Sequence, residues 1–343
     1  MQIGRREFLK YCIGSAAALG LDLTVLGKLE KALAASGPAV IWLNAANCTG
    51  CTVSLANRFS NTGPATDVGD LLINVINLSF HPNLMGAAGD QALEQLDYAV
   101  NNGGYVLAVD GGIPTLFGGR TCYVWTNSHE VTALEAVQNL AEGAIAVLGI
   151  GTCASFGGIP AGGPNPTRIE SLSSATGQPT INIPGCPTHP DWVVWTVAQL
   201  LAGNTPSLDS SGRPRELFSR NVHANCPRRG RGKARTFGEE GDCLMRLGCK
   251  GPRTQGDCPS RKWNSGTNWC IGANAICLGC TESGFPDAFA PFYRGIAIGD
   301  TNSAPVTDAD ADDLTSRSDG DDDSDSDYDD DSDNDRRRRS SRR

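Results

Sequence analysis

The sequence has no apolar run after its first 34 residues that is long enough to span a bilayer. It also has almost no net charge outside its last part. Residues 301–343 carry 15 acidic and 7 basic residues, so they account for eight of the nine net negative charges of the chain, and residues 1–300 sum to about −1. The lack of a basic surplus argues against nucleic acid as a partner.

The first 34 residues resemble a secretory signal. A basic opening is followed by an apolar stretch at 11–25 and by an A-x-A cleavage site at 32–34. Arg5 and Arg6, followed by "EFLK", resemble the twin-arginine type, whose cargo crosses the membrane folded. An ordinary signal with a chance arginine pair is the alternative. Asp22 argues against a stable anchor, so we expect the mature chain in the periplasm or at the outer face of the cytoplasmic membrane.

Residues 301–343 consist mainly of Asp, Ser and Arg without apolar periodicity. A segment of this composition cannot bury a core, so we expect it to be disordered and to act as a solvated appendage; a specific docking role is the alternative.

Between these ends, strand-like and helix-like patterns alternate. Strands are expected at five apolar runs, 39–46, 71–79, 105–111, 144–151 and 180–185, and helices at 84–100, 129–143 and 190–203. Alternation of this kind predicts an α/β fold with a parallel sheet wrapped by helices. The strands are almost continuously apolar, which fits burial on both faces.

Four cysteines follow the expected strands: Cys48 and Cys51 come after the first, Cys153 after the fourth and Cys186 after the last. Parallel sheets bind ligands at the carboxyl ends of their strands. A four-thiolate metal site therefore explains these cysteines better than four separate buried side chains do.

The stretch 204–300 has little periodic apolar sequence, so it needs cross-links or metals to hold it. Its potential ligands form two sets, which are His223, Cys226, Cys243, Cys249 and Cys258, Cys270, Cys277, Cys280. Spacing alone leaves structural zinc open, and a secreted chain leaves disulfides open. Three four-ligand sites favour iron–sulfur clusters in an electron-transfer chain, and so does the proline after Cys186, Cys226 and Cys258.

Six motifs occur in an order that resembles the small subunit of nickel–iron hydrogenases: "CTGC", "GTCASFGGIPAGGPNPT", "PGCPTHPDW", "HANCPRR", "CLMRLGCKGP" and "AICLGCTESGFPD". The resemblance covers about residues 36–290. It implies a flavodoxin-like, doubly wound domain at 35–203 and a smaller, irregular, mostly helix-and-loop iron–sulfur domain at 204–300. It also implies a heterodimer, in which a separate large subunit holds the nickel–iron site of this oxidoreductase. This chain would then carry no catalytic residue.

The resemblance also implies three cluster sites. A proximal 4Fe–4S cluster falls on Cys48, Cys51, Cys153 and Cys186. A distal 4Fe–4S cluster falls on His223, Cys226, Cys243 and Cys249. The medial cluster falls on Cys258, Cys277 and Cys280 together with position 270. Most members have proline at this position and a 3Fe–4S cluster, whereas Cys270 predicts a fourth iron and a 4Fe–4S cluster. The alternative is that Cys270 is a spare thiol.

Some positions depart from the family pattern or stand outside it. Oxygen-tolerant relatives have two extra cysteines where this chain has Gly50 and Gly158, so we expect a standard proximal cluster and ordinary inactivation by oxygen. In the family, the position before the first proximal ligand is often acidic, whereas this chain has Asn47 there. The basic stretch 228–235 suits either an anionic electron acceptor or a solvated loop. We expect no ligand role for the remaining residues of these types, which are His81, His129, His189, Cys12 and Cys122.

The resulting hypothesis is an electron-transferring subunit that passes electrons from hydrogen to a cytochrome or to a quinone-reducing membrane subunit. A hydrogen-sensing homologue and an exported protein held by metals or disulfides are the alternatives. The export signal argues against the sensor, because a sensor acts on cytoplasmic partners.

Overall fold

The computed structural model describes residues 38–59, 67–69, 76–126, 129–238 and 241–293. The chain divides into two units, residues 1–296 and 297–343, and every described residue belongs to the first. The expected signal at 1–34 and the expected disordered segment at 301–343 lie outside the described residues. The expected domain boundary near residue 203 stays a prediction.

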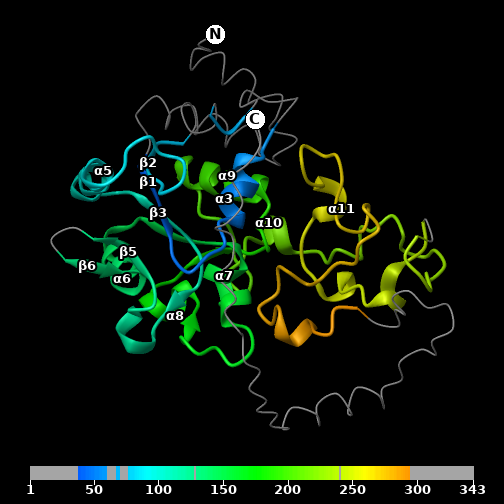
Figure 1. Ribbon diagram of the computed structural model, residues 1–343. Coiled ribbons are helices and arrows are strands. Elements are labelled where there is room, and N and C mark those ends of the chain that lie inside the picture. The colour runs from blue at the N-terminus through cyan, green and yellow to red at the C-terminus, as the bar shows by residue number, and fades with distance from the viewer. Residues whose placement is uncertain (1–37, 60–66, 70–75, 127–128, 239–240, 294–343) are drawn as a thin grey trace, which may run out of the picture. The chain divides into compact units, whose positions relative to one another are not determined.

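Five parallel strands form the central sheet (Figure 1). They are β1 (Val40–Asn44), β2 (Leu78–Phe80), β3 (Val106–Asp110), β7 (Ala146–Ile150) and β9 (Ile181–Ile183). Their order is β2-β1-β3-β7-β9, which is the flavodoxin-like order of a doubly wound sheet. The predicted fold class is therefore confirmed. The second strand lies at the end of its predicted run, of which residues 71–75 are not described.

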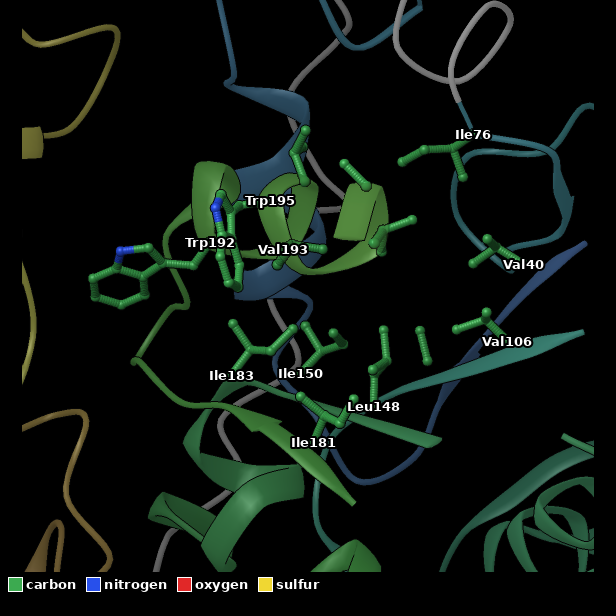
Figure 2. Close-up of a cluster of buried hydrophobic side chains, with 14 of the residues drawn as sticks. Val40, Ile76, Val106, Leu148, Ile150, Ile181, Ile183, Trp192, Val193 and Trp195 are labelled. Carbon is green, nitrogen blue, oxygen red and sulfur yellow. The ribbon is translucent and has the colours of Figure 1, made fainter. Parts of the chain in front are cut away.

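Successive residues of each strand point to opposite faces of the sheet, and both faces are buried. On one face, Trp42, Leu148 and Ile183 pack against α3 (Gly50–Ala56) and α9 (Pro190–Leu201). Figure 2 shows Trp192 and Val193 of α9 above the strand side chains. Each aliphatic side chain that is fully buried here stabilises the fold by about 1.5–3 kcal/mol.

The opposite face of the sheet packs against α5 (Asp90–Asn102) and α6 (Ala133–Gly143). The start of α6 is fixed by a cap, because Oγ1 of Thr132 accepts a hydrogen bond from the N–H of Glu135 at 3.1 Å. Helix α9 starts in a similar way. Nδ1 of His189 accepts from the N–H of Asp191, and a proline occupies the first helical position. All three predicted helices are thus present.

Shorter elements complete this part of the chain. They are the strand pairs β4 (Ile113–Pro114) with β8 (Ile169–Glu170) and β5 (Tyr123–Thr126) with β6 (Glu130–Thr132), the helices α7 (Gly151–Phe156) and α8 (Leu172–Thr176), and the 3₁₀ turns η1 (Leu116–Gly119) and η2 (Ile159–Ala161).

After Leu201 the described chain forms only short elements, as its composition predicts. They are α10 (Arg215–Phe218), η3 (Leu244–Leu247), η4 (Gly251–Arg253), α11 (Cys258–Arg261) and η5 (Asp287–Phe289). Leu244 and Leu247 of η3 belong to a small core of side chains from 222–277. Leu217 and Phe218 of α10 belong instead to the core on the α9 side of the sheet. Polar contacts join this region to the sheet region, for example from Trp192 Nε1 to Asp257 Oδ1 at 2.8 Å. Within the described part of the chain, none of the helices has the length and apolar character needed to cross a membrane.

Candidate iron–sulfur sites

The first site is built by three loops at the carboxyl edge of the sheet. These loops follow β1, β7 and β9 and carry the proximal set, Cys48, Cys51, Cys153 and Cys186. Burial, with the neighbouring Cys186, Asp110 and Cys48, raises the pKa of Cys153 to about 12. Burial and then the nearby Cys48 also raise the pKa of Cys186. Burial, then Asp110 and Cys153, raise the pKa of Cys51. Each of the four predicted thiols therefore has another member of the set nearby.

Glycines let the backbone approach these thiols closely. Gly151 has a φ of 77°, and a Cβ there would lie 2.5 Å from Sγ of Cys51. Gly158 has a φ of 55°, and a Cβ there would lie 3.0 Å from Sγ of Cys153. Because both positions have a positive φ and no room for a Cβ, a side chain at either one would displace the neighbouring cysteine.

Asp110 is a buried acid in this site that the sequence interpretation missed. It ends β3, is 2% exposed and lies beside Cys51. Burial raises its pKa to about 6, although hydrogen bonding to Cys51, Asn47 and the backbone of Thr52 acts to lower it. The Asn47 contact is loose, since neither Asn47 Nδ2 nor Asp110 Oδ2 makes a hydrogen bond of ordinary geometry within the described residues. An acid at the end of a buried apolar run was the available signal.

The medial set is Cys258, Cys270, Cys277 and Cys280. Burial, followed by the neighbouring Cys280, Cys277 and Cys270, raises the pKa of Cys258 well above its usual value. Burial is also the main cause that raises the pKa of Cys277 to about 12, and Cys270 contributes to it. Cys270 is exposed, and its charge contributes to the raised pKa values of Cys258 and Cys277. Its role as the fourth ligand of this set stays a prediction.

The distal set is His223, Cys226, Cys243 and Cys249. Burial, and then the thiols of Cys243 and Cys226, raise the pKa of Cys249. Gly251 lies close to both a cysteine and the histidine of this set. A Cβ at Gly251 would lie 3.5 Å from Sγ of Cys249 and 3.7 Å from Cβ of His223. His223 N–H also donates to the carbonyl oxygen of Gly251 at 3.1 Å.

Hydrogen bonds join the three sets. The hydroxyl of Thr152, which directly precedes the proximal Cys153, donates to the carbonyl oxygen of Cys280 in the medial set. Lys250 directly follows Cys249 of the distal set. Lys250 N–H donates to the carbonyl oxygen of Cys277 at 2.7 Å. The loops of neighbouring sets are therefore in direct contact.

Among the described residues, no group of three or more His, Cys, Asp or Glu side chains is arranged to hold a single metal ion. The donor chemistry fits iron–sulfur clusters, because soft thiolates are their usual ligands and each thiolate binds its own iron. Burial and mutual repulsion favour the protonated thiols, so a cationic cluster core is what would stabilise several thiolates side by side.

The other candidate residues have structural surroundings. His81 is fully buried and stacks on Trp42 with ring centroids 5.1 Å apart, and burial lowers its pKa to about 4. His189 caps α9 through Nδ1, and its Nε2 contacts the carbonyl oxygen of Lys262. Exposed His129 lies 3.7 Å from Glu135. Cys122 is half-buried against the core on the α6 side, and burial raises its pKa.

Comparison with known proteins gives two family matches. Residues 218–293 match the C-terminal family of the NiFe/NiFeSe hydrogenase small subunit, and residues 48–200 match the family "NADH ubiquinone oxidoreductase, 20 Kd subunit". The chain is similar to the periplasmic [NiFeSe] hydrogenase small subunit of Desulfomicrobium baculatum, with 38% identity over 85% of this chain and 99% of the relative. It is also 38% identical to the quinone-reactive Ni/Fe-hydrogenase small chain of Wolinella succinogenes, over 86% and 85%.

Solved structures agree with this relationship. The recombinant [NiFeSe] hydrogenase from Desulfovibrio vulgaris Hildenborough, in the oxidised state, matches with a TM-score of 0.69 and 40% identity. The match covers 75% of this chain and 97% of that one.

Proposed function

Since the chain belongs to the nickel–iron hydrogenase small-subunit family, and is thus the electron-transferring subunit of a hydrogenase, we propose that its three cysteine sets hold three iron–sulfur clusters in series. Small subunits of this family carry iron–sulfur clusters, and they work with a large subunit. The number and type of clusters in this chain, and the residues that hold them, are the content of the proposal.

The proximal set holds a 4Fe–4S cluster, and so does the distal set, in which His223 replaces one thiolate. A neutral imidazole in place of an anionic thiolate raises the reduction potential of the distal site. The medial set holds a third 4Fe–4S cluster, because Cys270 supplies the fourth thiolate. When bound, these clusters supply reversible one-electron redox chemistry.

Two hydrogen bonds between the sets carry this proposal. One runs from the hydroxyl of Thr152, next to Cys153, to the carbonyl oxygen of Cys280, and the other from the N–H of Lys250, next to Cys249, to the carbonyl oxygen of Cys277. Because each one joins the loop of one set to a residue of the next, they support the order proximal, medial, distal.

The place of the complex follows from the signal and from the relatives. Several relatives are named periplasmic hydrogenase small subunits. Together with the twin-arginine pattern at the start of this chain, this supports export of the folded protein to the periplasm or to the outer face of the membrane. The electron acceptor is then a cytochrome or a quinone-reducing membrane subunit, and one relative is named quinone-reactive.

Iron analysis of the purified heterodimer tests the proposal. We expect about twelve iron atoms per small subunit in addition to the iron of the large subunit, and a broad brown absorption band. Cys153→Ser should remove iron, whereas Cys122→Ser, a matched change outside the three sets, should not. A colourless folded small subunit, or equal iron in the two variants, would contradict the proposal.

A further inference from the structure

Exposed cations surround the distal set. We call them the distal rim, and they are Arg229, Arg231, Lys233, Arg235 and Arg246. The first four alternate along a loop between two distal ligands, and the fifth lies in the last turn of η3, which follows Cys243.

The backbone of this loop is fixed to the ligands themselves. Arg229 N–H donates to the carbonyl oxygen of Cys226 at 3.0 Å, and Cys243 N–H donates to that of Gly232 at 2.7 Å. Lys233 also pairs with Cys243 in an isolated bridge. The backbone that carries Arg229, Arg231 and Lys233 is therefore held next to Cys226 and Cys243.

The rim also concentrates positive charge on a chain whose first 300 residues have almost no net charge. Residues 226–249 contain six basic and three acidic residues, a net charge of +3, although residues 1–300 sum to about −1. Arg228 is turned inward, because its Nη1 donates to Asp242 O and Asn274 Oδ1. The other five face solvent at the end of the proposed electron path.

Apolar side chains accompany the charges. Met245 is 40% exposed beside Arg246 in the same 3₁₀ turn. Tyr293 is 53% exposed and packs edge-on against Phe237, with ring centroids 6.1 Å apart. Arg, Met and aromatic residues are the types that are enriched where proteins dock on one another.

We propose that the distal rim docks a redox protein whose cofactor edge is ringed by carboxylates. The inference rests on the proposed function, because it needs electrons to leave at the distal site. Opposite charges on the two surfaces raise the rate of encounter and orient the partner with its cofactor toward the distal ligands. The partner is reduced by one electron in each encounter, and the distal site is oxidised by one.

Two forms of one protein probe test the charge of the partner. The purified heterodimer under hydrogen is mixed with horse-heart cytochrome c, whose surface is basic, or with the same cytochrome after its lysines have been succinylated, which makes it acidic. At low ionic strength we expect the acidic form to be reduced about ten-fold faster. Added salt should slow the acidic form and speed the basic form.

Charge reversal locates the effect on the rim. Arg231→Glu with Lys233→Glu should remove most of the advantage of the acidic form, and the matched pair of Gln substitutions should remove about half of it. Arg215→Glu is the control, because this exposed arginine of α10 contacts Leu208 and Ser207 instead of the distal loop. The electron paramagnetic resonance signal of the distal site verifies that each variant is loaded.

Several outcomes would overturn the inference. Equal rates of reduction for the two cytochrome forms would do so. A preference for the acidic form that Arg215→Glu removes as fully as the rim variants do would also overturn it. Binding to vesicles of anionic phosphatidylglycerol that requires the rim, without any preference between the cytochromes, would make the rim a lipid contact. If the wild-type heterodimer reduces benzyl viologen under hydrogen, these failures concern the rim alone. If it reduces no acceptor, the proposed function itself fails.

Discussion

The side-chain hydroxyl of Thr152 donates a hydrogen bond to the carbonyl oxygen of Cys280. The same hydroxyl oxygen accepts one from the N–H of Gly185 at 2.9 Å. Thr152 directly precedes Cys153, and Gly185 directly precedes Cys186. One buried hydroxyl, on a residue that is 1% exposed, therefore fixes two proximal loops and one medial ligand relative to each other.

We expect Thr152→Val to loosen this junction. It leaves the N–H of Gly185 and the carbonyl of Cys280 buried without this partner, at a cost of about 1–3 kcal/mol each. The apparent unfolding temperature should fall. The medial reduction potential, followed by potentiometric electron paramagnetic resonance, should become more negative, because a donor near an anionic cluster is lost. Thr152→Ser keeps the hydroxyl and should restore both values. Equal behaviour of the two variants would show that the methyl group, and not the hydroxyl, is what matters.

Two glycines beside the proximal thiols should differ in their tolerance of alanine. At Gly158, which has a positive φ, an added Cβ would lie 2.9 Å from the backbone nitrogen of Cys153. At Gly50, which has no positive φ, it would lie 3.1 Å from Cys48 Sγ and 3.7 Å from Pro187 Cβ. Gly158→Ala should therefore lower the iron content of the purified protein and its thermal stability, and Gly50→Ala should change them much less. A reversed order of the two variants would mean that backbone strain does not limit the site.

The same two glycines underlie a prediction about oxygen. Since neither position carries the additional cysteine of oxygen-tolerant relatives, the proximal site has only its four thiols to respond to an oxidant. We expect hydrogen oxidation to stop within minutes of exposure to air. Hydrogen uptake measured on an electrode while the gas is switched tests this, and a steady current in air would contradict it.

Much of this architecture could be predicted from sequence, because the signals are local. The apolar run around Leu148 is read directly as a strand, and Cys153 follows it at the edge where parallel sheets bind ligands. The role of Thr152 could not be read, because its partner Cys280 is 128 residues away. The sequence shows Asp110 as an acid at the end of an apolar run, but only the folded sheet shows that the end of β3 faces a thiol from the loop after β1.

The route of export gives a separate prediction. If the protein crosses the membrane folded and loaded, replacing Arg5 and Arg6 together by Lys should leave it in the cytoplasm, and the large subunit should stay with it. Immunoblots of periplasmic and cytoplasmic fractions measure this. The ordinary secretory route exports unfolded chains, and its signal depends on the apolar stretch and not on the arginine pair. A double variant that is still exported would therefore argue for that route.

Cys270 decides the type of the medial cluster. It contributes to the raised pKa values of Cys258, Cys277 and Cys280. Its own turn is fixed because its carbonyl oxygen accepts from Ala275 N–H at 2.9 Å. A thiol held beside three others can bind the iron at the fourth corner, so we expect four irons at this site.

Electron paramagnetic resonance of the oxidised heterodimer separates the two cluster types, because an oxidised 3Fe–4S cluster is paramagnetic and an oxidised 4Fe–4S cluster of this kind is not. The wild type should show no 3Fe–4S signal, and Cys270→Pro should show one spin per molecule. The variant should also have a higher medial potential, because one anionic thiolate has been removed. Cys122→Ala, the matched control, should resemble the wild type. A full 3Fe–4S signal in the wild type would mean that Cys270 is a bystander, in spite of its position beside the other three thiols.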